Sequence, residues 1–440
     1  MKNKKQTKQN FFTIIITIFV IVFFASAFSI IFIKPIMTKN NNSNNNVDKY
    51  VDVNFNDLKR QLTPSILNNN NVSIYTTINL DNENIVDITS FGAIANDNID
   101  DTNAINTAIN SLSNGGLVYI PNGIFNVNVN TCINLKDNIT MFGNGNSSVI
   151  KLADNQSNSN NIVKIESKNN VNLYNFSIDG NINNQDKNNY TQYGLFVSSS
   201  NNCFVERIFV SNVNGVGIQL YNSENCVVNQ CYSSNNKYHG FEIEQSNYCQ
   251  LLNSYGANNE RHGVLISPGE IGSQGSHYNN VKSCYFFENK ECGISFSLAN
   301  DNLGDGLSYA NTITNNIVFD NYYCGIQSFK VDKCFIKDNL VVNNGGFGIY
   351  LYSSMENVVM NNYLLNNSQK SHGTYDEIRI ESSLTKDSCY STISNNTILI
   401  KSNIKARYGI HDTSYNGNYI NDNVITYKGS SDYVYIVKTN

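Results

Sequence analysis

A short phrase of alternating apolar and polar residues recurs along the middle of the chain, each time directly after a glycine. The glycines are spaced 23, 23, 23, 30, 32 and 23 residues apart. Period-two alternation predicts short strands, and a nearly fixed period predicts that the strands stack as a solenoid, with one loop insertion at each of the two longer spacings. The phrase begins at Gly194, Gly217, Gly240, Gly263, Gly293, Gly325 and Gly348.

Two further phrases return at matching intervals. In one, an asparagine or similar residue precedes a residue that we expect to face inward, as in Asn202-Cys203, Asn225-Cys226, Asn280-Val281, Asn311-Thr312 and Asn357-Val358. The other comprises Ile208, Cys231, Ser254, Cys284, Asn316, Asn339 and Asn362. Three short strands per turn, with Asn and Gly corners that tolerate left-handed backbone, predict an all-β fold, a parallel β-helix.

The N-terminal part of the chain has a different pattern. Residues 1–10 carry four lysines, and residues 11–33 contain no charge. About 20 apolar residues cross a bilayer as a helix, and the preceding lysines favour a cytoplasmic N-terminus. We therefore predict a cytoplasmic tail at 1–10, a single-pass transmembrane anchor at 11–33 and an extracellular remainder. The alternative is a secreted protein with a cleaved signal peptide, because Ala25-Ser26-Ala27 resembles a cleavage site.

The Asn-rich residues 34–84 have few apolar positions, which is typical of a stalk or linker. The β-helix domain is predicted at 85–440. Near its start, Ala104, Ile105 and Ala108 recur at helical spacing. We expect this helix to cap the first coil, because the open end of a solenoid exposes core residues and unpaired strand edges. A strand at Tyr433–Val437 is expected to close the domain.

The net charge and the cysteine spacing limit which partners the protein can bind and what its cysteines can do. The net charge of -5 gives no support for nucleic-acid binding. Cys203, Cys226 and Cys249 are 23 residues apart, which favours a buried stack of thiols over a disulfide framework. Cys292 and Cys324 both precede a repeat glycine and are the best candidate for a bridge. No CxxC pair supports a zinc site.

The start of the domain resembles the pectate-lyase superfamily, whose fold is a right-handed β-helix. The resemblance rests on the segments 87–93, 100–105, 108–109 and 115–123. The segments 178–181, 259–263 and 408–410 further resemble the catalytic module of secreted mannuronan C5-epimerases. Those enzymes carry a catalytic Tyr-Gly-Phe-Asp-Pro-His segment, but the matching residues 216–221 here read Val-Gly-Ile-Gln-Leu-Tyr. The family's basic residues match Lys187, Arg261 and His262.

Equal positions of successive coils stack about 4.8 Å apart, so the repeats predict which side chains share one outer face. This face should bring polar residues from adjacent coils into one groove. The predicted catalytic residues are His239, Tyr221, His262, Arg261 and Lys187. The predicted substrate-binding residues are Gln219, Glu242, Glu244, Tyr350 and Tyr352, and the two last rings suit stacking on sugars.

Removal of the C5 proton of a uronate needs a cation for the carboxylate, a base and an acid. Arg261 and Lys187 suit the first role, and His239, His262 and Tyr221 suit the other two. Glu242 and Glu244 could instead serve a glycosidase or bind Ca²⁺, which is the one cofactor that the sequence suggests. The sequence favours a cell-surface protein that acts on a polyuronate by epimerisation or elimination. The alternative is a non-catalytic, glycan-binding β-helix or adhesin.

Overall fold

The computed structural model describes residues 84–185, 191–269, 275–297, 308–384, 386–400, 406–415, 417–427 and 436–438. These residues belong to one compact unit, Asn70–Asn440. The predicted tail, membrane anchor and stalk up to residue 83 lie outside them, as does most of the predicted closing strand. No helix in the described part of the chain is long and apolar enough to cross a membrane.

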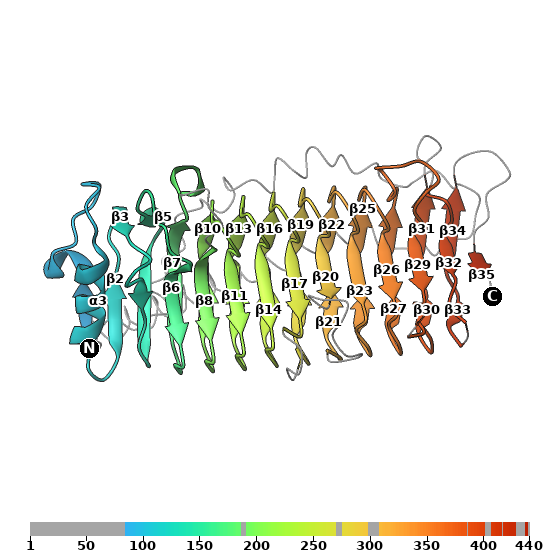
Figure 1. The fold of residues 1–440 in the computed structure, drawn as a ribbon. Helices are drawn as coiled ribbons and strands as arrows, with labels where there is room; N and C mark the ends of the chain where they lie inside the picture. The colour runs from blue at the N-terminus through green and yellow to red at the C-terminus, as the bar shows by residue number, and fades with distance from the viewer. Residues whose placement is uncertain are drawn as a thin grey trace, which may run out of the picture. The chain divides into compact units, whose positions relative to one another are not determined.

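The strands stack in sequence order from the N-terminal helix to the C-terminal strands, and all of their pairings are parallel (Figure 1). One face of the stack is a sheet of twelve described strands, hereafter the twelve-stranded sheet. Its members are β4 (Ile133–Asn134), β6 (Asn160–Glu166), β8 (Gln192–Ser198), β11 (Ile218–Tyr221), β14 (Phe241–Glu244), β17 (Val264–Ser267), β20 (Ile294–Ser297), β23 (Ile326–Phe329), β26 (Ile349–Tyr352), β29 (Ile378–Glu381), β32 (Ile410–Asp412) and β35 (Ile436–Lys438).

The other described strands form two ladders that share β5 (Ile139–Leu152) and β7 (Asn172–Asp179). The first ladder also contains β1 (Ile85–Asp87), β2 (Gly116–Tyr119), β9 (Phe204–Glu206), β12 (Val227–Asn229), β15 (Gln250–Leu252), β18 (Asn280–Lys282), β21 (Thr312–Thr314), β24 (Phe335–Lys337), β27 (Val358–Met360), β30 (Thr392–Ser394) and β33 (Tyr419–Asn421). The second adds β3 (Gly123–Val127), β10 (Phe209–Ser211), β13 (Tyr232–Ser234), β16 (Tyr255–Ala257), β19 (Tyr285–Phe287), β22 (Ile317–Phe319), β25 (Leu340–Val342), β28 (Tyr363–Leu365), β31 (Thr397–Ile400) and β34 (Val424–Tyr427). The predicted three-strand coil is therefore confirmed.

A short helical region caps the N-terminal end of the stack. It comprises η2 (Ile88–Phe91) and α3 (Thr102–Ser111), and a further turn, η3 (Ile182–Asn184), lies between β7 and β8. Ile105, Ala108 and Ile109 of α3 are buried, as their spacing predicts. Asn106 bridges to the first strand of the twelve-stranded sheet: its amide donates to the carbonyl of Cys132 at 2.7 Å and accepts from the Asn134 N–H at 2.9 Å. The helix thus satisfies part of an edge that would otherwise lack a partner.

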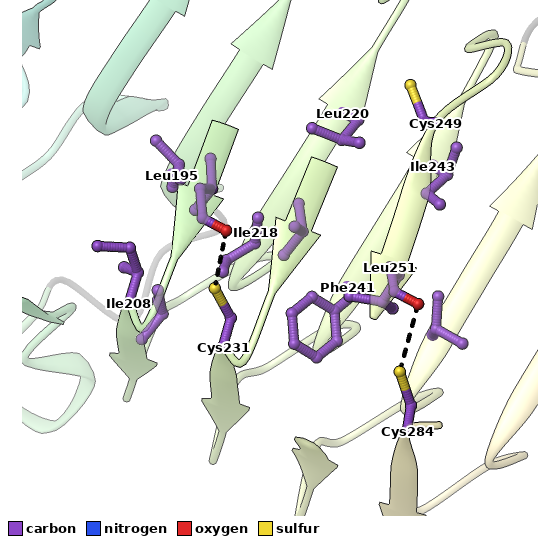
Figure 2. Packing of buried hydrophobic residues seen from close by; sticks show 14 of the residues in the cluster. Leu195, Ile208, Ile218, Leu220, Cys231, Phe241, Ile243, Cys249, Leu251 and Cys284 are labelled. Carbon is purple, nitrogen blue, oxygen red and sulfur yellow. Dashed lines mark hydrogen bonds between the residues drawn. The ribbon is translucent and has the colours of Figure 1, made fainter. Parts of the chain in front are cut away.

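Aliphatic side chains, phenylalanine rings and thiols fill the interior of the coils (Figure 2). The Sγ of Cys231 lies 3.6 Å from the carbonyl oxygen of Val205, and that of Cys284 lies 3.4 Å from the carbonyl of Leu251. All ten cysteines are buried and free, which confirms the expected stack of thiols. The alternative of a Cys292–Cys324 bridge is wrong for this structure, because the Cys292 thiol instead contacts Gln327 Oε1 at 3.0 Å.

Buried asparagines stack along the corners, a feature that the sequence analysis placed only at the turns. After the first asparagine of the main ladder, each Oδ1 accepts the backbone N–H and the Nδ2–H of the asparagine one coil earlier, at 2.9–3.1 Å. A Cβ at Gly240 would lie 2.7 Å from Asn259 Nδ2, so the repeated glycine makes room for the ladder. The main ladder comprises Asn236, Asn259, Asn289, Asn321, Asn344 and Asn367.

At a second corner the expected phase was wrong by one residue. Thr312 and Val358 were expected to face inward, but both are only partly buried. The preceding Asn311 and Asn357 are fully buried instead. Asn311 Oδ1 accepts from the Asn279 N–H at 2.9 Å, and Asn357 Oδ1 accepts from the Cys334 N–H at 2.9 Å. Their side-chain hydrogen bonds offset the burial of a polar group, so an asparagine serves where the earlier coils have a cysteine.

The main ladder ends on a buried carboxyl. Asn367 donates its backbone N–H and its Nδ2–H to Glu377 at 2.9 and 2.6 Å, and Glu377 stands in register with the glycine of the previous coil. Burial raises the pKa of Glu377 to about 7 in spite of these two donors. The ladder therefore terminates in a group that titrates near neutral pH.

We expect Glu377→Gln to reduce the pH dependence of stability between about pH 4.5 and 7. A carboxyl whose pKa is raised by folding stabilises the native state in its protonated form. This contribution is complete below the ordinary pKa of 4.5 and is lost as the pH rises through about 7. Urea unfolding of wild type and variant at pH 4.5 and pH 8 gives the free energy of unfolding of each protein. The change in their difference between the two pH values measures the contribution of Glu377, at about 1.4 kcal/mol per pKa unit. Parallel pH profiles for the two proteins would contradict the assignment.

Candidate functional site

The candidate site lies on the outer side of β11 and β14. Gln219 stands in register with Glu242, and Tyr221 with Glu244. The structure therefore brings four of the predicted residues onto two adjacent strands. Gln219 and Glu242 are nonetheless buried, whereas Tyr221 and Glu244 are partly exposed. The alternation of the sequence places side chains on the correct side of a strand, but it does not reveal how deeply neighbouring chain covers them.

Two carboxyl groups of β14 have different environments. Glu242 is 9% exposed, and burial, followed by the charge of Glu244, raises its pKa to about 8. Glu244 Oε2 accepts a hydrogen bond of 2.8 Å from Gln219 Nε2. Glu242 is therefore protonated at neutral pH beside a carboxylate that is stabilised by an amide donor. Two neighbouring carboxyls in different environments are suited to act as an acid and a base.

His239 and His262 form a stack at the position before the repeat glycine. Their rings lie 5.1 Å apart between centroids, with 4° between their planes. The His262 N–H donates to His239 Nδ1 at 3.3 Å, and the Cys292 N–H donates to His262 Nδ1 at 3.1 Å. A ring nitrogen that accepts an N–H carries no proton, so the proton of a neutral ring lies on Nε2. Each histidine thus presents Nε2–H as a donor.

The two histidines differ in what surrounds Nε2. His262 Nε2 lies 3.0 Å from Glu291 Oε2, and this hydrogen bond lowers the pKa of Glu291. His239 is 5% exposed, and burial is the main cause that lowers its pKa. His239 is therefore neutral at physiological pH. In this tautomer it can donate a hydrogen bond from Nε2 but cannot accept a proton there.

Of the two predicted cationic residues, Arg261 lies within the described residues. The guanidinium of exposed Arg261 lies over the ring of Tyr238, 4.7 Å from its centroid. The ring of Tyr221 stacks on Phe196 with centroids 6.0 Å apart, and its hydroxyl lies 3.5 Å from Gln245 Nε2. Lys187 lies outside the described residues, so its predicted role stays a prediction.

Tyr350 and Tyr352 lie on β26, four strands beyond β14 and thus about 19 Å away along the stack. Tyr352 stacks on Phe329 at 4.7 Å, and the Tyr350 hydroxyl donates to Glu381 Oε2 at 3.1 Å. The structure therefore separates these rings from the carboxyl pair, although they share its face.

Beside Tyr350 lies an ion cluster that the sequence analysis missed. Asp376 is fully buried, and Arg407 donates to both of its oxygens, at 3.0 and 2.8 Å. His411 Nδ1 lies 3.2 Å from Asp376, and Arg379 stands in register with both Tyr350 and His411. The strand register could have placed Arg379 and His411 beside Tyr350, but the longer spacing of these coils made that register hard to derive from the sequence. Arg379 also pairs with Glu381 at 3.2 Å, so two arginines face two carboxylates, and the cluster lies too far from Glu242 to act there.

Metal ligands do not gather in the described part of the chain. No three His, Cys, Asp or Glu side chains there form a group that could hold a metal ion. The expectation that Glu242 and Glu244 could bind Ca²⁺ therefore gains no support from the neighbouring side chains.

Comparison with known protein families matches residues 142–297 and 193–368 to the right handed beta helix region. Together these matches cover residues 142–368, more than half of the chain. The chain belongs to the right-handed β-helix family. Two other families match parts of this β-helix: rhamnogalacturonase A/epimerase, pectate lyase-like, over residues 85–177, and periplasmic copper-binding protein (NosD) over residues 307–439. The comparison with curated proteins gives no match.

Solved structures resemble this right-handed β-helix at low sequence identity. The A-module of a mannuronan C-5 epimerase from Azotobacter vinelandii has a TM-score of 0.69 at 19% identity, covering 81% of this chain and 100% of the module. An exopolygalacturonase from Thermotoga maritima has a TM-score of 0.64 at 16% identity, with 79% and 93% covered. A surface adhesin of Streptococcus pneumoniae has a TM-score of 0.56 at 15% identity, with 81% and 93% covered. These similarities show the fold, and they do not show which chemistry the site performs.

Proposed function

We propose that this β-helix acts on acidic polysaccharides by acid–base chemistry at Glu242 and Glu244. The observation that carries the proposal is the split environment of the two carboxyls, since Glu242 has a pKa of about 8 and Glu244 is held by the Gln219 amide. The match to a pectate lyase-like and epimerase family, and the similarity to a mannuronan epimerase module, support an acidic glycan as the substrate.

The reaction that we favour begins with removal of the C5 proton of a uronate unit. Glu244 acts as the base, and Arg261 and the His239 Nε2–H stabilise the negative charge that spreads onto the substrate carboxylate. In epimerisation, protonated Glu242 or a water molecule returns a proton to C5 on the opposite face. In elimination, the C4–O bond breaks instead, a C4=C5 double bond forms, and Glu242 protonates the leaving oxygen.

This assignment changes the roles that the sequence suggests for three residues. His239 and His262 were candidates for the base, but their Nδ1 atoms accept backbone N–H groups. Glu244, first considered as a substrate-binding residue, is the better base because its carboxylate is partly exposed. Tyr221 is in register with Glu244 and is placed to contact a sugar hydroxyl.

Incubation of the purified protein with alginate and polygalacturonate in D₂O tests the proposal. Deuterium at C5 identifies epimerisation, and unsaturated ends that absorb in the ultraviolet identify elimination. New reducing ends without unsaturation would indicate hydrolysis by the same two carboxyls, which would contradict proton abstraction. No chemical change in any acidic glycan would contradict a catalytic role.

Glycan binding without catalysis is the second candidate. Gln219, Leu220 and Tyr221 stand where the mannuronan epimerases carry their Asp-Pro-His segment. An adhesin has the same fold, so the architecture itself does not require an activity. Binding of a glycan that persists unchanged after long incubation would favour this function.

A further inference from the structure

A polar cavity of about 580 Å³ lies between the capping helix and the first strands of the twelve-stranded sheet. The exposed face of α3, including Asn106, forms one wall, and outward residues of β4 and β6 line the opposite side. A second cavity of about 480 Å³ shares Lys136 and Lys168 with it. Cavities of this size are sufficient for small ligands or single units of a polymer.

The charge of the cavity is positive in a protein whose net charge is -5. Three ammonium groups and one carboxylate line it: Lys136, Lys164 and Lys168 against Glu166. Lys136 Nζ is held at the end of the helix by the carbonyls of Leu112 and Asn110, at 3.2 and 3.4 Å. Lys164 Nζ lies 2.9 Å from Glu166 Oε2, and Asp137 lines the second cavity together with Lys136 and Lys168. The excess of two positive charges makes the cavity attractive to anions.

The register connects this cavity with the carboxyl pair. Lys164 pairs with Phe196, Phe196 with Gln219, and Gln219 with Glu242. Three steps of about 4.8 Å place the lysine about 14 Å from Glu242 along the stack. The rings of Phe196 and Tyr193, whose centroids are 5.7 Å apart, lie between them. A cationic cavity, an aromatic surface and an acid–base pair therefore follow one another along one face.

We propose that the lysine cavity binds a carboxylate of the acidic glycan, several sugar units away from the unit at Glu242. The inference rests on the proposed function and specifies its substrate as a linear, multiply charged polymer. The Glu244 carboxylate itself repels an anion, and a distant cationic anchor offsets this repulsion. Because about 14 Å exceeds the Debye length of about 8 Å at physiological ionic strength, the lysines attract the chain without greatly lowering the pKa of Glu242.

Binding of oligogalacturonates and alginate oligomers of increasing length to the full protein tests the anchor. We expect a Lys164→Gln/Lys168→Gln variant to bind long oligomers about tenfold more weakly at low salt, with a smaller salt dependence. Disaccharides should bind both proteins equally, since they cannot reach from Glu242 to the cavity. Lys282→Gln is the matched control, because this lysine is exposed on β18, outside the twelve-stranded sheet. A carboxyl-reduced oligomer should lose the advantage of length.

The outcomes separate the anchor from the reaction. Equal binding of long oligomers by wild type and the double variant would overturn the anchor, and so would absence of any acidic-glycan binding. Lysine-dependent binding without turnover would retain the anchor and contradict the proposed reaction. If inorganic sulfate at equal charge concentration competes as well as a long uronate oligomer does, the cavity is a general anion site and the proposal fails.

Discussion

Replacing Asn289 by alanine should lower the free energy of unfolding by about 3 kcal/mol or more, because several buried polar groups lose their partners at once. Asn289 is 1% exposed, and its Oδ1 accepts from the N–H and Nδ2–H of Asn259. Its own Nδ2 donates to the Gly256 carbonyl at 2.9 Å and to Asn321 Oδ1 at 2.9 Å. Alanine removes all four hydrogen bonds. It also leaves a void that the neighbouring side chains cannot easily fill.

Urea unfolding followed by circular dichroism and by tyrosine fluorescence measures this loss, and two probes are needed because stacked repeats can unfold in steps. Asn258→Gly is the matched control. Asn258 is exposed with a φ of 56°, a conformation that glycine adopts readily, so the change should stay within about 1 kcal/mol. A loss of similar size in both variants would show that the ladder adds nothing beyond ordinary corner residues.

Replacing Glu244 by glutamine should reduce turnover of an acidic glycan at least about 100-fold, because the amide cannot accept a proton. Glutamine keeps the size of the side chain and can still bond to Gln219, and it removes a charge that repels the glycan, so binding should not weaken. Glu260→Gln is the control. Glu260 is exposed, and its Oε1 lies 2.6 Å from Lys290 Nζ. Stopped assays of product formation, with binding measured separately, distinguish a catalytic from a structural effect. Full turnover by Glu244→Gln would eliminate this residue as the base.

The acid gives the same reaction a pH dependence. Glu242 must be protonated to donate, and its pKa of about 8 predicts that turnover falls as the pH rises above that value. Glu242→Gln should abolish this alkaline limb together with most of the activity in elimination. A profile that remains flat up to pH 10 would contradict the assignment of Glu242 as the acid.

The fold was predictable because the information repeats. Each coil restates the same alternation after a glycine, so an error in one coil is corrected by its neighbours. What the repeat did not reveal is the reason for the glycine. Gly240 leaves space for Asn259, which lies 19 residues later in the sequence and one coil further along the stack. The phase of Asn311 was misjudged because asparagine was assigned only to turns, whereas hydrogen bonding also permits it in the interior.

The candidate site was only partly predictable. Tyr221, Glu242 and Glu244 could be placed together from the repeat alone, because the repeat fixes the register of neighbouring parallel strands. The role of His239 depends on the backbone N–H that its ring accepts, and the role of Glu242 depends on its burial. Both are properties of the folded chain. The lysine cavity escaped notice because α3, which builds one of its walls, belongs to the cap and shares no repeat phase with the coils.

The uniform register has an evolutionary consequence. Asn321, Asn344 and Asn367 are separated by 23 residues, and each accepts the same pair of hydrogen bonds from the coil before it. Duplication of one such segment would insert a coil whose two surfaces already match both neighbours. Each insertion would lengthen the twelve-stranded sheet by about 4.8 Å. The distance from Glu242 to the tyrosines of β26 is thus a heritable length that can change in equal increments, without redesign of either end.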